Sequence, residues 1–99
     1  MGETAAKSGI STAFRDRVLA GEFLVGTFVK TPAPHIVEIA GLAGLDFVVL
    51  DAEHAPFDRA ALDMALLASH AANIPAMVRI PRYDSEMTGA CLDLGASGI

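Results

Sequence analysis

The chain has 99 residues, of which 53% are hydrophobic and 19% charged, and its formal net charge is −5 at pH 7. This composition is typical of a packed globular fold and unlike that of disordered segments. The acidic balance argues against a nucleic-acid partner, and no apolar run reaches the about 20 residues of a membrane span. The single cysteine excludes a disulfide framework and residues 1–8 lack a signal peptide's apolar core, so we expect a cytoplasmic protein.

The predicted elements alternate between helices and strands. They are a helix over residues 11–20, strands over 22–30, 47–50 and 76–80, helices over 34–41, 59–72 and 85–94, and the start of a further strand at 97–99. Asp58 and Asp84 are natural caps for the later helices, and Gly21, Gly44 and Gly95 are natural stops. Residues 1–10 have only a weak pattern, and we expect a flexible tail there.

The alternation of strands and helices predicts an α/β fold with parallel strands and right-handed crossovers. A complete (β/α)₈ barrel takes about 250 residues. Residues 11–99 are therefore expected to be a partial barrel domain of three to four βα units, truncated in the fourth strand. An open, valine-rich sheet edge would need a partner, so a larger parent protein or an oligomer is expected.

The stretch from Phe47 to Asp58 carries the clearest functional signal. Its apolar run from Val48 to Leu50 is typical of a parallel strand buried on both faces, which has no place for a charge. Asp51, Glu53 and His54 follow, so we expect them in the loop at the carboxyl end of the strand, where ligands bind in α/β folds. Solvated loop charges are the alternative, more so for Glu53 than for Asp51.

Arg79 ends the next predicted strand along the chain. Because neighbouring parallel strands end at the same edge of a sheet, we expect Arg79 close to His54; a surface salt bridge is its alternative. Lys30 ends the first predicted strand and could instead form a Schiff base with a carbonyl substrate, which requires a buried amine. Three other residues that could carry chemistry are expected to have structural roles. His35 and His70 are expected to be ordinary helix residues, and Cys91 a small buried hydrophobic residue.

Five segments, in order, resemble the N-terminal part of the metal-dependent pyruvate aldolases. They are Gly26-Thr-Phe-Val-Lys-Thr-Pro32, Val37-Glu-Ile-Ala-Gly-Leu-Ala-Gly-Leu-Asp46, Leu50-Asp-Ala-Glu-His-Ala-Pro56, Val78-Arg-Ile-Pro81 and Leu92-Asp-Leu-Gly-Ala96. The resemblance covers residues 21–99 and is to the 4-hydroxy-2-oxoheptanedioate and 2-dehydro-3-deoxyglucarate aldolases of the HpcH/HpaI aldolase and citrate lyase superfamily. It implies the N-terminal portion of a TIM (β/α)₈ barrel.

The resemblance also implies roles for individual side chains. His54 matches the catalytic base, Arg79 the residue that stabilises the enolate-like transition state, and Asp93 the carboxylate that raises the basicity of the histidine. These residue types suit the chemistry, since imidazole transfers protons near neutral pH and arginine offers a planar fork to an enolate or carboxylate. Asp51 is a further candidate for orienting the ring. An ordinary turn aspartate is the alternative for Asp93.

The implied reaction is cleavage of a 4-hydroxy-2-oxo acid to pyruvate and an aldehyde, in enzymes that often form hexamers. The implied cofactor is a divalent metal, Mg²⁺, Mn²⁺ or Co²⁺, which prefers oxygen ligands. No counterpart of the family's metal ligands precedes Ile99, so they are expected after it, and the isolated chain is expected to be inactive. We expect small-molecule partners and a homo-oligomer, with no nucleic acid and no membrane.

Two other functions compete with the pyruvate aldolase. Within the same superfamily, the acyl-CoA lyases of the citrate lyase β-subunit and malyl-CoA type share the fold, although the Asp51-Ala-Glu-His-Ala-Pro56 string favours the aldolases. The other is a non-catalytic half-barrel chain that associates through its open sheet edge.

Overall fold

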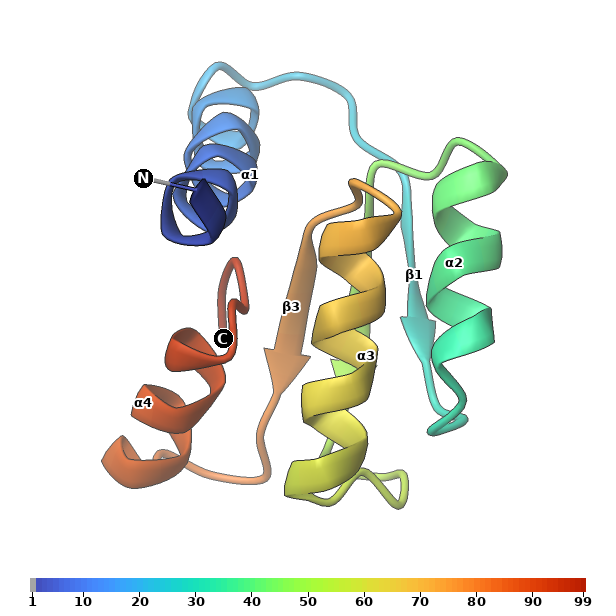
Figure 1. Cartoon of the computed structure of the whole chain (residues 1–99), viewed down its shortest axis with the longest axis vertical. Coiled ribbons are helices and arrows are strands. Elements are labelled where there is room, and N and C mark those ends of the chain that lie inside the picture. Colours follow the sequence, from blue (N-terminus) through green and yellow to red (C-terminus); the bar gives the residue numbers. More distant parts are fainter. Residues whose placement is uncertain (1) are drawn as a thin grey trace.

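The computed structural model describes residues 2–99, with side chains described from Gly9 onward (Figure 1). The elements are α1 (Gly2–Leu19), β1 (Gly26–Val29), α2 (Pro34–Leu42), β2 (Phe47–Asp51), α3 (Arg59–Ala71), β3 (Ala76–Arg79) and α4 (Ser85–Asp93). The three strands form one parallel sheet in the order β1-β2-β3. The predicted alternation and parallel pairing are therefore confirmed.

Helix ends follow the predicted capping residues. The Asp58 side chain accepts a hydrogen bond from the Ala61 amide (2.8 Å) at the start of α3, and Asp84 accepts from the Glu86 and Met87 amides at the start of α4. Gly95 follows α4 with φ +107°, a left-handed conformation that costs a residue with a side chain more than it costs glycine. Local chemistry therefore determines where these two helices begin or end.

Three differences from the predicted boundaries affect the fold. Strand β2 extends to Asp51, which the sequence analysis expected in the loop, because Asp51 still pairs with Arg79 of β3. Helix α1 begins at Gly2 rather than after Ser11, because the Ala-, Glu- and Lys-containing start of the chain holds no proline to stop helix propagation. Strand β1 begins at Gly26 rather than at residue 22, since its pairing with β2 starts at Gly26 opposite Phe47. Apolar strand-formers ahead of that point, such as Phe23 at 91% exposure, have no neighbouring strand to pair with.

The sheet buries one face against α2 and α3. Its fully buried residues Val29, Val48, Leu50 and Val78 pack in one cluster with helix residues that include Val37 and Leu66. Successive strand residues point to opposite faces, so Phe28, Val49, Asp51, Met77 and Arg79 lie on the other face. The register pairs Asp51 with Arg79 at the carboxyl edge, whereas the sequence predicts Arg79 close to His54.

Helix α1 lies across the amino ends of the strands, at the top of Figure 1. Its Phe14 is 6% exposed and packs on Phe47, with ring centroids 5.6 Å apart. Beyond α4, Gly98 forms a parallel bridge with Met77, so the predicted start of a fourth strand is confirmed. Within residues 2–99, no helix is both long and apolar enough to cross a membrane.

Candidate active site

Asp51 and Arg79 form the centre of the carboxyl edge. The guanidinium donates from Nε to Oδ1 (3.2 Å) and from Nη2 to Oδ2 (2.7 Å), a bidentate pair. The Asp51 side chain is 0% exposed, whereas Arg79 is 33% exposed. A buried carboxylate needs such a partner because burial without one is costly. The remaining N–H groups of Arg79 are left for another acceptor.

The loop after β2 is held by the same carboxylate. Oδ1 of Asp51 accepts hydrogen bonds from the backbone amides of Glu53 (3.1 Å) and His54 (2.9 Å), which is an Asx-turn arrangement. The imidazole of His54 lies between two carboxylates, with Nδ1 3.7 Å from Asp51 Oδ2 and Nε2 3.7 Å from Glu53 Oε1. The ring is 56% exposed and thus open to a substrate.

Two further side chains reach this edge: Lys30, which the sequence offers as a Schiff-base candidate, and Phe28, whose position there was not predicted. Lys30 directly follows β1, and its Nζ lies 3.7 Å from Asp51 Oδ2 with the side chain 61% exposed. Phe28 lies under Arg79, whose guanidinium carbon is 4.4 Å from the ring centroid, a cation–π contact. Lys30 lies near Asp51 because Val29 pairs with Leu50, which places the two residues that follow them at the same level of the edge.

The electrostatics of the pair follow from these contacts. The hydrogen bonds from Arg79, opposed by burial and helped by the His54 and Glu53 amides, hold the pKa of Asp51 well below its usual range. The hydrogen bonds to Asp51 raise the pKa of Arg79 above its usual value. Both side chains therefore stay charged across the range of pH in which enzymes work.

An open hollow of about 530 Å³ lies on the sheet face that α2 and α3 do not cover. Arg79 and Phe28 line it together with the apolar side chains of Val49 and Met77. A second apolar hollow, of about 480 Å³, lies under α1 at the amino end of the sheet, where Phe14 and Phe47 line it. Only the first hollow adjoins the cluster of charged groups, so we assign the candidate active site to the carboxyl edge.

The sequence profile of the HpcH/HpaI aldolase/citrate lyase family matches residues 24–99. The chain belongs to this family. A similar curated relative is the 5-keto-4-deoxy-D-glucarate aldolase of Klebsiella pneumoniae, which is 34% identical over 82 residues. Those residues are 83% of this chain and 32% of the relative, so the chain spans about a third of the length of the curated relatives it matches.

Solved structures of family members superpose on the fold. The HpcH/HpaI aldolase of Desulfitobacterium hafniense has a TM-score of 0.76 at 32% identity and is matched over 83% of this chain and 32% of its own. The citrate synthase SbnG has a TM-score of 0.77 at 32% identity, over 83% of this chain and 34% of its own. The fold of the matched part of the chain is thus the start of the βα barrel of these structures, as predicted from the family resemblance.

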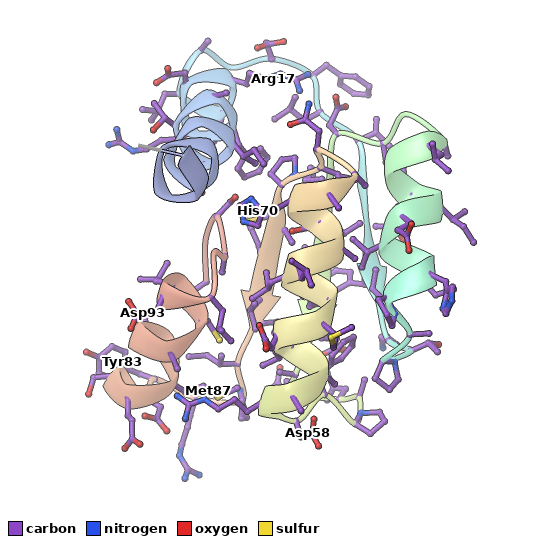
Figure 2. All side chains as sticks on the ribbon, viewed as in Figure 1. Arg17, Asp58, His70, Tyr83, Met87 and Asp93 are labelled. Carbon is purple, nitrogen blue, oxygen red and sulfur yellow. The ribbon has the colours of Figure 1, made fainter. Side chains whose placement is uncertain are left out.

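Asp93 is not brought to His54 within the chain. Helix α4 starts beside the carboxyl edge and runs back along the sheet, which carries its last residue away from that edge. Asp93 is exposed and projects on the side of α4 away from β3 (Figure 2). The carboxylates next to the His54 ring are instead Asp51 and Glu53. Asp51, which the sequence analysis named only as a further candidate, is therefore the carboxylate that lies next to both Arg79 and His54. The role of Asp93 stays a prediction.

Aldolases of this family generally depend on a divalent metal. Among the side chains described, those of residues 9–99, no three of His, Cys, Asp or Glu gather closely enough to hold one. Asp51 is already taken up by Arg79 and two backbone amides, and Glu53 Oε1 lies 3.7 Å from Arg79 Nε. The described residues therefore do not fit a metal site, and we assign no step of the chemistry to metal ligands among them.

The remaining candidates lie away from this edge. His35 is exposed on α2, and Cys91 is a buried free thiol whose pKa is raised by burial, as expected of a small buried hydrophobe. His70 ends α3 near the amino side of the sheet, with Nε2 2.9 Å from the Gly95 carbonyl oxygen (Figure 2). Its buried Nδ1 has no partner among the described residues.

Proposed function

We propose that the protein is a class II aldolase, a carbon–carbon lyase that cleaves 4-hydroxy-2-oxo acids to pyruvate and an aldehyde. The observation that carries this proposal is the position of His54 beside the Asp51–Arg79 pair, at the carboxyl edge of a family fold. A relative named 5-keto-4-deoxy-D-glucarate aldolase supports it, because that name describes an oxo acid.

His54 would accept the proton of the substrate's 4-hydroxyl group. The C3–C4 bond then breaks, C4 becomes the carbonyl carbon of the aldehyde, and the bond's electron pair forms the enolate of pyruvate. A proton added at C3 completes pyruvate. An exposed ring flanked by two carboxylates suits this step, since negative charge lies where the imidazolium forms.

Arg79 would stabilise the negative charge that develops on the pyruvate half. Two of its N–H groups are fixed on Asp51, which leaves the rest of a rigid, permanently charged fork for the enolate oxygen or carboxylate. Asp51 would act through its neighbours, by orienting Arg79 and the loop that carries His54. For Asp93 we propose the role that the family resemblance implies, to raise the basicity of His54.

The metal requirement is part of the proposal and rests on the family. When bound, Mg²⁺, Mn²⁺ or Co²⁺ would polarise the 2-oxo acid. The proposed partners are the small 2-oxo acid and aldehyde, with neither nucleic acid nor membrane. A cytoplasmic location is proposed with them, consistent with a buried thiol that forms no disulfide.

The test is an assay of pyruvate release from a 4-hydroxy-2-oxo acid with Mn²⁺ or Mg²⁺, using the protein in the form its gene encodes. We expect His54→Ala to lower the rate by about 10²–10⁴, the usual contribution of general base catalysis. The matched control is His35→Ala, an exposed histidine on α2 that should leave the rate unchanged. A chelator should abolish the activity. Release unaffected by either the chelator or His54→Ala would contradict the mechanism.

A second candidate is an acyl-CoA lyase of the citrate lyase β-subunit or malyl-CoA type. The observation that favours it is the fold similarity to a citrate synthase, with a TM-score of 0.77. Assays of the same preparation with an acyl-CoA substrate and with a 4-hydroxy-2-oxo acid distinguish the two. An acyl-CoA lyase would release acetyl-CoA from the first substrate, whereas the aldolase would release pyruvate from the second. Absence of both activities would favour a non-catalytic chain.

A further inference from the structure

Three functional side chains meet at one oxygen atom of the carboxyl edge. Oδ2 of Asp51 lies 2.7 Å from Arg79 Nη2, 3.7 Å from His54 Nδ1 and 3.7 Å from Lys30 Nζ. Lys30 comes from the β1 side, His54 from the loop after β2, and Arg79 from β3. Since β2 is the middle strand, the proposed base lies between two cations.

Asp51 does not need Lys30. Its oxygens already accept hydrogen bonds from two backbone amides and from both Nε and Nη2 of Arg79. The 3.7 Å separation from Lys30 is too long for a hydrogen bond. With a side chain 61% exposed, the ion pair is screened by water and holds Lys30 weakly. Among the described residues, the ammonium has no hydrogen-bonded acceptor, so it is free to bind an anion at the site.

We propose that Lys30 is a specificity-determining residue that binds a negatively charged group on the aldehyde half of the substrate. In a 4-hydroxy-2-oxo acid the hydroxyl lies between the pyruvate half and the aldehyde half. With the pyruvate half at Arg79 and the hydroxyl at His54, the aldehyde half extends toward Lys30. The flexible stem of lysine lets the ammonium swing from Asp51 to a terminal carboxylate. This inference rests on the proposed aldolase function.

The same geometry argues against a Schiff base at Lys30. An amine that attacks a carbonyl must lose its proton, which burial in an apolar pocket favours. The Lys30 side chain is 61% exposed, so it has no such apolar pocket. An arginine at this position would preserve anion binding but would be unable to form a Schiff base, so Lys30→Arg distinguishes the two roles.

The test compares two aldehydes of equal length in the condensation direction with pyruvate: 4-oxobutanoate, which has a terminal carboxylate, and butanal, which lacks one. Lys30→Met should raise the KM for 4-oxobutanoate by about tenfold to a hundredfold, as expected for a lost charged hydrogen bond. The KM values for butanal and for pyruvate should stay unchanged. Lys30→Arg should retain most of the preference.

Arg82→Met is the matched control, because Arg82 is an exposed cation at the same edge that lines the neighbouring hollow. It should leave the ratio of the two KM values unchanged. Equal effects of Lys30→Met on both aldehydes, an effect on pyruvate alone, or the same shift in Arg82→Met would overturn the proposal. Loss of all activity in Lys30→Arg would overturn it in favour of a Schiff base.

Binding of unreactive ligands separates this proposal from the aldolase function. Calorimetry would compare 2-oxoheptanedioate with 2-oxoheptanoate, which match the length of the condensation products and differ in the terminal carboxylate. Tighter binding of the diacid that disappears in Lys30→Met supports the role of Lys30, even if no condensation occurs. Condensation without any such preference would leave the aldolase function intact and would overturn the role of Lys30.

Discussion

Two arginine clusters lie at opposite ends of the sheet. At the carboxyl end, Arg79 pairs with Asp51 and joins β3 to β2. At the amino end, Arg17 of α1 donates to Asp46 (2.9 Å) and to Glu22 (3.3 Å), which joins α1 to the turn before β2 (Figure 2). Both clusters tie together segments that are distant in sequence. They differ in burial, because Asp51 is 0% exposed whereas Asp46 is 25% exposed.

Burial determines what each cluster can do. Water screens the Arg17 contacts, so they hold α1 in place with little free energy. The carboxylate of the Asp51–Arg79 pair is shielded from water. Loss of either partner would therefore leave the other charge without a counter-ion. It therefore keeps an oriented cation at the edge where a substrate would bind. The predictions below test this contrast in order of decreasing effect.

The largest effect is expected for Arg79→Met. The substitution leaves the buried Asp51 carboxylate without its cation and removes the proposed enolate stabiliser. We expect kcat to fall by about 10²–10³ and the urea midpoint to fall further than in any substitution of Arg17. Pyruvate release and urea unfolding measure the two effects. An Arg79→Met protein as stable as the Arg82→Met control would contradict the importance of burial.

The second effect is on acid stability. The pKa of Asp51 is lower in the folded protein than the about 3.9 of an unfolded aspartate. Its contribution to the free energy of unfolding is therefore present above about pH 4 and is lost as the pH falls further. Asp51→Asn should lower stability at pH 7 and flatten its decline below pH 4, as measured by urea unfolding across pH.

The matched variant for the acid experiment is Asp46→Asn. The Val25 amide and Arg17 also lower the pKa of Asp46, so the direction of its effect is the same. Because Asp46 is partly exposed, its effect on the slope should be smaller than that of Asp51. Equal slopes for the two variants would remove the proposed difference between the clusters.

The smallest effect is expected for Arg17→Met. Its contacts with Asp46 and Glu22 are surface pairs, so the urea midpoint should fall only slightly. In 1 M salt, where the Debye length is about 3 Å, the difference from the unsubstituted protein should disappear. The loss caused by Arg79→Met should persist in the same salt. A salt-resistant effect of Arg17→Met would mean that Arg17 itself stabilises the protein by more than screened charge pairs.

Residue types that act locally were read correctly from the sequence. Asp58 and Asp84 cap their helices, and the apolar run at Val48 to Leu50 forms the buried middle strand. The position of Arg79 at the edge where β2 ends also followed from strand order, because parallel strands end at one edge. These features depend on short-range chemistry or on a simple topological rule, which one sequence is enough to show.

Features that depend on which surfaces meet were missed. The stacking of Phe28 under Arg79 and the approach of Lys30 to Asp51 require the strand register. Strand β1 is shorter than its composition indicates because β2 begins pairing only at Phe47. The direction of α4, which carries Asp93 away from the carboxyl edge, also could not be read from the sequence, and the role of Asp93 beside His54 stays a prediction.

The sequence by itself determined the order of elements, the family, and the residue types that could transfer a proton or hold an anion. Only the tertiary structure decided that Asp51 is the shared partner of Arg79, His54 and Lys30. The physical reason is that charge in a fold is governed by burial and by neighbours across strands. Neither the burial of a side chain nor its neighbours across strands can be read from the spacing of residues along one strand.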